Sequence, residues 1–289
     1  MTQVSKITTS ILIPAHNEAA VIGRTLAHLG RGLCRDTVEV IVIPNGCRDR
    51  TAEAAREAMP EAIVLETQVP GKANAMRLGL ARARGEAIVF LDADLDVDAA
   101  AIGRLVAPLL RGEALASHGG MDVDLKGCSA AVRGFYAIWQ RGPYLRGGKF
   151  GGLFAVARAG LERITPLPDV TADDEYVSRA FRPSEKAYVR DVRFVARAPR
   201  TLAALFAVRK RVRRGTRELG RMGHGASGGG GRGHLVGALA RPMLWAPLLV
   251  FLSLTVSVRV ALMFEATGGA PKWERDDSSR VPVARRGDL

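Results

Sequence analysis

Three short runs rich in Asp, Asn and Glu contain the residue types in this sequence that could do chemistry. They are 14–18 (PAHNE), 44–49 (PNGCRD) and 92–96 (DADLD). Each run follows a short apolar segment that is typical of a buried strand. Because ligands of parallel sheets bind at the carboxyl ends of the strands, the three runs are expected to share one site.

Asp92 and Asp94 are the strongest metal-ligand candidates in these runs. The two carboxylates stand close together directly after an apolar segment, and no Lys or Arg lies beside them in the sequence to neutralise them. Carboxylate oxygens are the ligands that Mg²⁺ and Mn²⁺ prefer, and such an ion can bridge the phosphates of a substrate. The alternative is a solvated turn in which Asp98 caps the next helix. The neighbouring strand ends favour the metal site.

Taken in order, these motifs resemble those of the family-two glycosyltransferases, which have the GT-A fold. The resemblance runs from about residue 11 to residue 215. It implies an enzyme of the hexosyltransferase type that moves a sugar from a nucleoside-diphosphate carrier to an acceptor. It further implies inversion at the anomeric carbon and a requirement for Mg²⁺ or Mn²⁺, with UDP- or GDP-sugars as the favoured donors.

The resemblance also implies which residues bind the donor. Asp94 is the expected direct metal ligand, with Asp92 as its companion. The glycine-rich stretch 147–152 is expected to form the floor of the acceptor site. The residues expected to line the nucleotide pocket are Pro14, Ala15, Asn17, Glu18, Asn45, Asp49, Lys72, Asp92 and Ala93.

Two further positions are implied to act in the reaction itself. Asp174, in the pair Asp173-Asp174, is the expected general base, although either member could take the proton from the acceptor hydroxyl. Arg211 lies in the basic run 209–215 (RKRVRRG), which lacks the glutamine and tryptophan of the family pattern. It is expected to stabilise the departing diphosphate, or alternatively to bind anionic lipid.

The apolar spacing predicts the elements that must position these residues. Because strands and helices alternate, an α/β fold with a mainly parallel sheet flanked by helices is expected. The family resemblance implies that this sheet is the mixed, Rossmann-like sheet of the GT-A fold. The predicted strands are 11–13, 38–43, 63–65 and 87–91, and the predicted helices are 18–29, 51–58, 72–84 and 98–110. The predicted organisation is a catalytic domain at 8–222, a glycine-rich basic linker at 223–241, an apolar helix at 242–264 and a disordered tail at 265–289.

Charge and hydropathy set the second half of the chain apart. Of a net charge of +13, much falls in residues 197–241, which include eleven Lys or Arg and one acidic residue, Glu218. Residues 243–264 contain one charge, Arg259, and as a helix would be about 33 Å long against a hydrocarbon core of about 30 Å. A membrane-spanning or interfacial helix is predicted, with the catalytic domain on the cytoplasmic side of the cell membrane. A lipid or lipid-linked glycan is therefore one class of acceptor to consider.

Two other function classes remain open from the sequence. A phosphatase of the haloacid-dehalogenase type also places two Asp after a buried strand, with the first as nucleophile. A non-catalytic, basic, membrane-anchored binding protein would use only the second half of the chain. Nucleic acid is not expected as a partner, because the basic run lacks interleaved aromatic residues and any zinc or helix-turn-helix pattern. Three scattered cysteines also argue against a disulfide framework.

Overall fold

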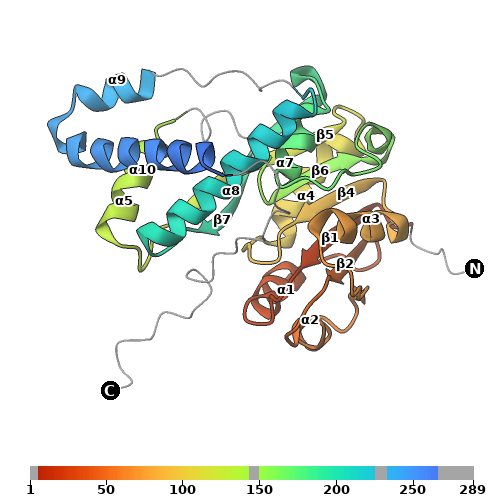
Figure 1. The fold of residues 1–289 in the computed structure, drawn as a ribbon. Helices are drawn as coiled ribbons and strands as arrows, with labels where there is room; N and C mark the ends of the chain where they lie inside the picture. Colours follow the sequence, from red (N-terminus) through yellow and green to blue (C-terminus); the bar gives the residue numbers. More distant parts are fainter. Residues whose placement is uncertain (1–5, 143–149, 225–232, 266–289) are drawn as a thin grey trace, which may run out of the picture. The chain divides into compact units, whose positions relative to one another are not determined.

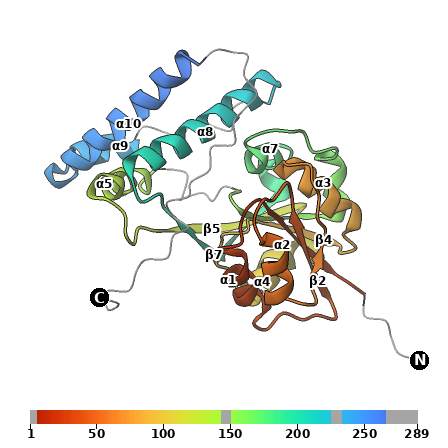
Figure 2. The same ribbon diagram turned by 60° about the horizontal axis from the view of Figure 1, so that its bottom comes forward.

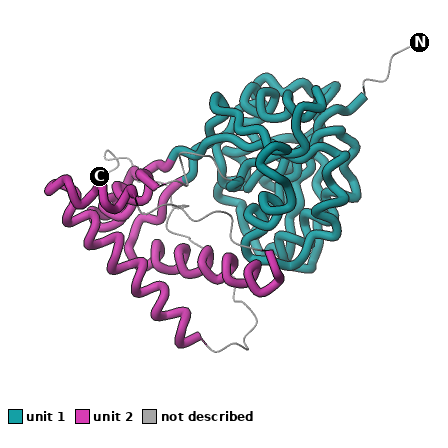
Figure 3. Tube along the Cα trace, turned by 90° about the horizontal axis from the view of Figure 1, so that it is seen from above, with its two compact units in different colours: residues 1–122, 148–196 teal, residues 123–147, 197–289 magenta. Residues whose placement is uncertain are grey.

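The computed structural model describes residues 6–142, 150–224 and 233–265 of the 289-residue chain. The chain divides into two compact units (Figure 3). The first unit consists of residues 1–122 and 148–196, and the second of residues 123–147 and 197–289. Each unit is a separate body with its own buried core.

A seven-stranded sheet in the order β3-β2-β1-β4-β6-β5-β7 forms the centre of the first unit (Figure 1). β1 is parallel to β2 and β4, and β2 is parallel to β3, whereas β6 is antiparallel to β4 and β5. This confirms the predicted mixed, mainly parallel sheet. The strands are β1 Thr9–Ala15, β2 Val38–Pro44, β3 Ile63–Val64, β4 Ala87–Leu91, β5 Ala116–Asp124, β6 Leu153–Ala157 and β7 Lys186–Arg197.

Helices cover both faces of this sheet (Figure 2). Alternation along β1 shows why: Ile11 and Ile13 are buried in one apolar cluster with residues of α1, α2 and α4, whereas Leu12 is buried in another with residues of α3 and α7. These helices are α1 Ile22–Gly30, α2 Thr51–Ala58, α3 Lys72–Arg82, α4 Ala99–Leu110 and α7 Asp173–Arg179, with short 3₁₀ turns at η1 Arg158–Arg163 and η2 Pro183–Glu185.

The predicted helices of the first half are confirmed, with two local details. α1 begins at Ile22 rather than at residue 18, because Asn17 has a left-handed backbone (φ 54°) and the chain makes a turn before the helix. α4 begins after Asp98, whose side chain accepts a hydrogen bond from Ala101 N at 2.6 Å. The capping role considered for Asp98 is therefore correct.

The second unit is built from helices. Its main core joins α5, α8 and α10 through side chains such as Phe135, Leu205 and Leu254. α8 thus belongs to the second unit, although residues 8–222 were predicted to form one domain. The helices are α5 Ala130–Trp139, α8 Leu202–Arg221, α9 Gly233–Leu239, η3 Pro242–Leu244 and α10 Trp245–Met263.

The structure describes part of the predicted linker 223–241 and all of the predicted apolar helix 242–264. Part of the predicted linker 223–241 is the helix α9, because Ala238 is buried against Ile138 and Leu248. Residues 225–232 and 266–289, which include most of the predicted tail, lie outside the described residues. Within the described part of the chain, Pro242–Met263 is long and apolar enough to cross a membrane.

Candidate active site

The three predicted runs meet at one edge of the sheet. They follow β1, β2 and β4, which lie side by side in the order β2-β1-β4 and run parallel. The three runs therefore lie at one edge of the sheet, as the order of the elements predicted. This edge is also where an open α/β sheet places its ligands.

Asn45 fastens the elements at this edge to one another. Its side-chain amide donates to Ala15 O at 2.8 Å and to Ile43 O at 3.3 Å, and its Oδ1 accepts from Gly71 N at 3.0 Å. The side chain is buried, and these three backbone contacts account for both its amide ends. Asn45, a predicted residue of the nucleotide pocket, therefore links β1, β2 and the start of α3.

The loops after β1 and β2 are tied together by side chains of the predicted set. Asn17 Oδ1 accepts from Arg48 N at 2.7 Å. The carboxylate of Asp49 accepts from Ala19 N at 3.2 Å and from Thr51 N at 3.1 Å. These contacts hold Asn17 in a left-handed conformation that a non-glycine residue rarely adopts, a feature that is concentrated at functional sites.

Four more of the predicted pocket residues contribute mainly through their position in the backbone. Pro14 and Ala15 end β1, and the carbonyl of buried Ala93 accepts from Thr25 of α1. Glu18 is buried, and its N–H donates to the hydroxyl of Thr51 at 2.8 Å.

α1 holds the aspartate run 92–96 in place. Thr25 Oγ1 donates to Ala93 O at 2.8 Å, and Arg24 Nη2 donates to Asp94 O at 3.4 Å. Arg24 Nε also forms an ion pair with Asp96 Oδ1 at 2.9 Å. Asp96 therefore has a structural partner in α1. Arg24 and Thr25 both contact this run, although no sequence pattern had singled them out.

Lys72 joins the predicted donor site to the predicted catalytic pair. Its Nζ lies 2.7 Å from Asp92 Oδ1 and 2.9 Å from Asp173 Oδ2. Asp92 follows β4, Lys72 begins α3 and Asp173 begins α7, so three separate elements meet at one ammonium group. No Lys or Arg is adjacent to Asp92 in the sequence, and the residue that neutralises it, Lys72, is distant in sequence and close only in the fold.

Charge and burial shift the pKa values of two groups in this cluster, Lys72 and Asp174. Burial opposes the charged form of Lys72, but attraction to Asp173 and Asp92 outweighs it and raises the pKa of Lys72 above its ordinary value. Burial, together with repulsion from Asp173, raises the pKa of Asp174 to about 7. The Asp174 carboxyl also accepts from Glu175 N at 2.8 Å. A carboxyl that titrates near neutral pH is suited to act as a general base.

The donor set fits a divalent cation only with help from a substrate. In residues 6–142, 150–224 and 233–265, no three His, Cys, Asp or Glu side chains gather as a ready-made metal site. However, the carboxylates of Asp92 and Asp173 already hold one cationic group, the ammonium of Lys72. Hard oxygen ligands from Asp92 and Asp94 could hold Mg²⁺ or Mn²⁺ if phosphate oxygens completed the coordination.

Because Gly152 has no side chain, the carboxylate of Asp92 can occupy the space beside it. Asp92 N donates to Gly152 O at 2.8 Å, and a Cβ at Gly152 would come within 2.5 Å of Asp92 Oδ2. The glycine-rich stretch 147–152 was predicted as an acceptor floor. Its described part instead shows a steric role beside the aspartate, and residues 147–149 lie outside the described residues.

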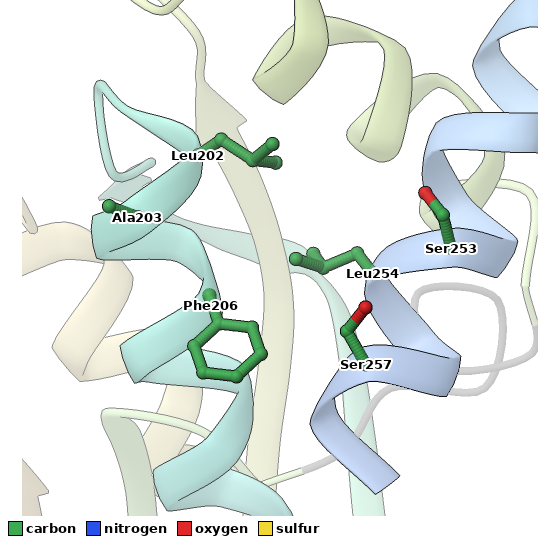
Figure 4. A pocket seen from close by; sticks show the side chains of 6 residues that line it. All are labelled: Leu202, Ala203, Phe206, Ser253, Leu254 and Ser257. Atoms are coloured by element: carbon green, nitrogen blue, oxygen red, sulfur yellow. The ribbon is translucent and has the colours of Figure 1, made fainter. Parts of the chain in front are cut away.

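Arg211 and one pocket lie in the second unit. Arg211 is in α8, where its neighbours Lys210 and Arg214 form ion pairs with Glu265 at 2.5 and 2.7 Å. A pocket of about 450 Å³ lies between α8 and α10 (Figure 4). It contains none of the predicted site residues. Its lining consists of Leu202, Ala203, Phe206, Ser253, Leu254 and Ser257.

Comparison with known proteins gives a consistent picture for the first half of the chain. Residues 10–153 match the family described as Glycosyl transferase family 2. The chain is 34% identical over 112 residues to "Probable glycosyltransferase YdaM" of Bacillus subtilis, which covers 36% of this chain and 27% of that protein. It is 34% identical over 115 residues to "Glucosyl-3-phosphoglycerate synthase" of Mycobacterium tuberculosis, covering 37% of this chain and 36% of that protein. The matches thus span about a third of these relatives' lengths.

Solved structures are similar over more of the chain. The crystal structure of the M. tuberculosis glucosyl-3-phosphoglycerate synthase has a TM-score of 0.56 at 25% identity and covers 77% of this chain and 83% of that chain. A mannosyltransferase from Pyrobaculum calidifontis, solved with GDP-Man and Mn²⁺, has a TM-score of 0.58 at 22% identity and covers 89% of this chain and 76% of that chain. The phosphatase and the non-catalytic alternatives gain no support from these matches. Residues 10–153 are therefore similar to the Glycosyl transferase family 2, and the first unit has a GT-A-like fold.

Proposed function

We propose that the first unit transfers a sugar from a nucleoside-diphosphate sugar to an acceptor, with inversion at the anomeric carbon. The observation that supports this most is the contact of Lys72 with both Asp92 and Asp173. This contact brings three predicted residues into one cluster: Asp92 as a metal ligand, Lys72 as a nucleotide-binding residue and Asp173 as a member of the carboxylate pair that contains the general base. The similar M. tuberculosis enzyme, solved with Mn²⁺, UDP-glucose and phosphoglyceric acid, supports a UDP- or GDP-sugar as the donor class.

Each residue of the cluster has a distinct part in this proposal. A divalent ion at Asp92 and Asp94 would neutralise charge that develops on the departing diphosphate. Asp174 would take the proton of the attacking hydroxyl, as its raised pKa allows. Lys72 holds Asp92 and Asp173 in a fixed relation, so the donor side and the base side keep their spacing. Inversion requires these two sides to be on opposite faces of the sugar.

Donor binding is the direct test of the proposal. Thermal unfolding of the full chain should shift upward with one of UDP-, GDP- or dTDP-sugars, and the shift should require Mn²⁺ or Mg²⁺, because a ligand stabilises the state that binds it. A metal chelator should remove the shift. If no sugar nucleotide stabilises the protein in the presence of either ion, the proposed activity is wrong.

The acceptor can be assigned by class with the same preparation. Phosphorylated small acids and polyprenyl phosphates are the two classes that the similar proteins suggest, because these include a glucosyl-3-phosphoglycerate synthase and an undecaprenyl-phosphate transferase. Transfer of radiolabelled sugar to one class and not the other would distinguish them. This experiment can be interpreted only after a donor has been found.

Activity should depend on pH through Asp174. Its pKa is raised to about 7, so the carboxylate that acts as base is fully formed above pH 7 and is lost as the pH falls below 7. We expect kcat to fall about tenfold for each pH unit on the acidic side of the profile. An acidic limb near pH 4, the ordinary range of an aspartate, would contradict the proposed environment of Asp174.

Replacing Gly152 with Ala should weaken metal-dependent nucleotide binding. The new methyl group would collide with Asp92 Oδ2 and force that side chain away from Lys72. We expect affinity for the Mn²⁺–nucleotide complex to fall roughly tenfold or more, since a small displacement of a ligand group is costly. Gly103→Ala is the matched control, because nothing lies within 4 Å of a Cβ there. Equal affinities of the two variants in calorimetry would exclude this role.

A further inference from the structure

One side of α10 is left uncovered by the second unit. Leu248, Leu254, Val258 and Leu262 are buried on α5, α8 and α9, and each is less than 8% exposed. The opposite side presents large apolar residues at helical spacing, which we call the apolar stripe. The stripe consists of Trp245, Leu249, Leu252, Val256, Val260 and Met263, each at least 40% exposed. Tertiary packing therefore gives α10, which is apolar on all sides, one buried side and one exposed side.

A group of arginines, which we call the arginine cluster, lies where α8 meets α10. It comprises Arg209, Arg213 and Arg217 of α8 and Arg259 of α10. Burial and the positive charges of the other three lower the pKa of Arg213. Arg213 Nε is buried and makes no hydrogen bond within the described residues. Such a cluster is electrostatically suited to an anion.

Two other members of the cluster contact aromatic or carbonyl groups. Arg209 lies over the rings of Phe135 and Trp139, at 5.7 and 5.9 Å from their centroids. Arg217 donates to Leu262 O at 3.1 Å. Aromatic faces and carbonyl groups stabilise a guanidinium but leave its positive charge in place.

We propose that the apolar stripe and the arginine cluster dock the second unit on an anionic lipid bilayer, with α10 lying in the plane of the interface. The stripe would enter the boundary between headgroups and acyl chains, while the arginines bind lipid phosphates. The pocket between α8 and α10, where Leu202, Phe206 and Leu254 face one another, offers an apolar place for an acyl chain (Figure 4).

The packing of α8 on α10 argues against a membrane-spanning position. A helix that crosses the bilayer alone is surrounded by lipid, but α10 has one side covered by protein. If α10 crossed the bilayer, α8 would bring Arg209 near the middle of α10, because Arg209 lies over the ring of Phe135, which stacks on Phe251 of α10. Charged side chains are strongly disfavoured at that depth. A second copy of the chain is a poorer partner for the stripe, because two arginine clusters would then repel each other.

Vesicle binding tests the docking surface in the full chain. The protein should sediment with vesicles of phosphatidylcholine that contain phosphatidylglycerol, bind weakly to phosphatidylcholine alone and be released by salt. The double variant Leu249→Gln/Val256→Gln should bind at least about tenfold more weakly, and Arg213→Gln about fivefold more weakly. Leu110→Gln and Arg111→Gln, exposed positions of the first unit, are the matched controls and should bind normally. Loss of self-association instead of vesicle binding in the stripe variant would overturn the proposal in favour of a dimer.

Labelling of the two helix ends tests the in-plane position. Met243 and Phe264 flank α10 and are 93% and 84% exposed. Single Met243→Cys and Phe264→Cys variants in a Cys34→Ser background can be treated with an impermeant maleimide in sealed inside-out vesicles from cells that produce the full chain. An in-plane helix leaves both ends on the cytoplasmic side, so both should react above the Cys34→Ser background. Protection of one end alone would show a spanning helix and overturn the in-plane arrangement. Neither test depends on sugar transfer.

Discussion

Asp174→Asn should lower kcat on the order of a thousandfold while nucleotide binding that depends on Mn²⁺ is retained. An amide cannot take the proton of the acceptor hydroxyl, and general base catalysis contributes roughly that much to such reactions. The donor ligands Asp92 and Asp94 are unchanged in this variant, so the nucleotide should still raise the unfolding temperature. Single-turnover transfer and thermal shift, measured on the same preparation, separate the two effects.

Stability provides a check that the variant is folded. The pKa of Asp174 is raised above its ordinary value, so the ionised carboxylate destabilises the fold above pH 7, and this cost disappears at low pH. At pH 8 the Asn variant should therefore unfold at the same temperature as the parent or at a higher one. Asp169→Asn, at a carboxylate whose side chain is 77% exposed, is the matched control and should leave kcat unchanged. Normal turnover by the Asp174 variant would move the base role to Asp173.

Lys72→Met should destabilise the protein and make its stability depend on divalent metal. The substitution leaves the carboxylates of Asp173 and Asp92 without their shared cation, and removing one partner of a buried ion pair costs up to about 3 kcal/mol when one group is partly exposed. Mn²⁺ should then restore more stability in the variant than in the parent, because the ion no longer competes with an ammonium group for Asp92. Thermal unfolding with and without MnCl₂, in the absence of nucleotide, gives both quantities.

An exposed ion pair provides the control for the Lys72→Met variant. Lys6 pairs with Glu86 at 3.1 Å, and both side chains are about half exposed or more. Exposed pairs contribute little to stability, so Lys6→Met should change the unfolding temperature only slightly and should not alter the response to Mn²⁺. If Lys72→Met and Lys6→Met behave alike, Lys72 has no special role in holding the cluster together.

The sequence predicted the sheet and the edge that holds the site because both depend on local patterns. Alternation in 11–13 sends Ile11 and Ile13 to one face and Leu12 to the other, and breakers mark where each strand ends. Carboxylates placed directly after β4 then follow from chain order alone. Asp173 and Asp174 were predicted from the family resemblance, which does not specify the contact between Asp173 and Lys72.

Only the tertiary structure showed which of these polar groups are used to hold the site together. The side chain of Asn45 forms hydrogen bonds with the backbone of Ala15, Ile43 and Gly71. Lys72 neutralises Asp92 from a different helix, and a Cβ at Gly152 would displace that aspartate. Such contacts join residues far apart in the chain, and neither spacing nor propensity encodes the distance between them.

In the second unit too, the sequence determined one property and tertiary packing another. Residues 243–264 are apolar on every side, so composition by itself predicted a helix that could span or lie on a membrane. Packing on α5 and α8 decides which side of α10 is covered and which side remains as the apolar stripe. The sequence by itself determined that α10 avoids water. Tertiary packing decided which side stays exposed, because a helix with no polar face can bury any of its sides and its neighbours select one.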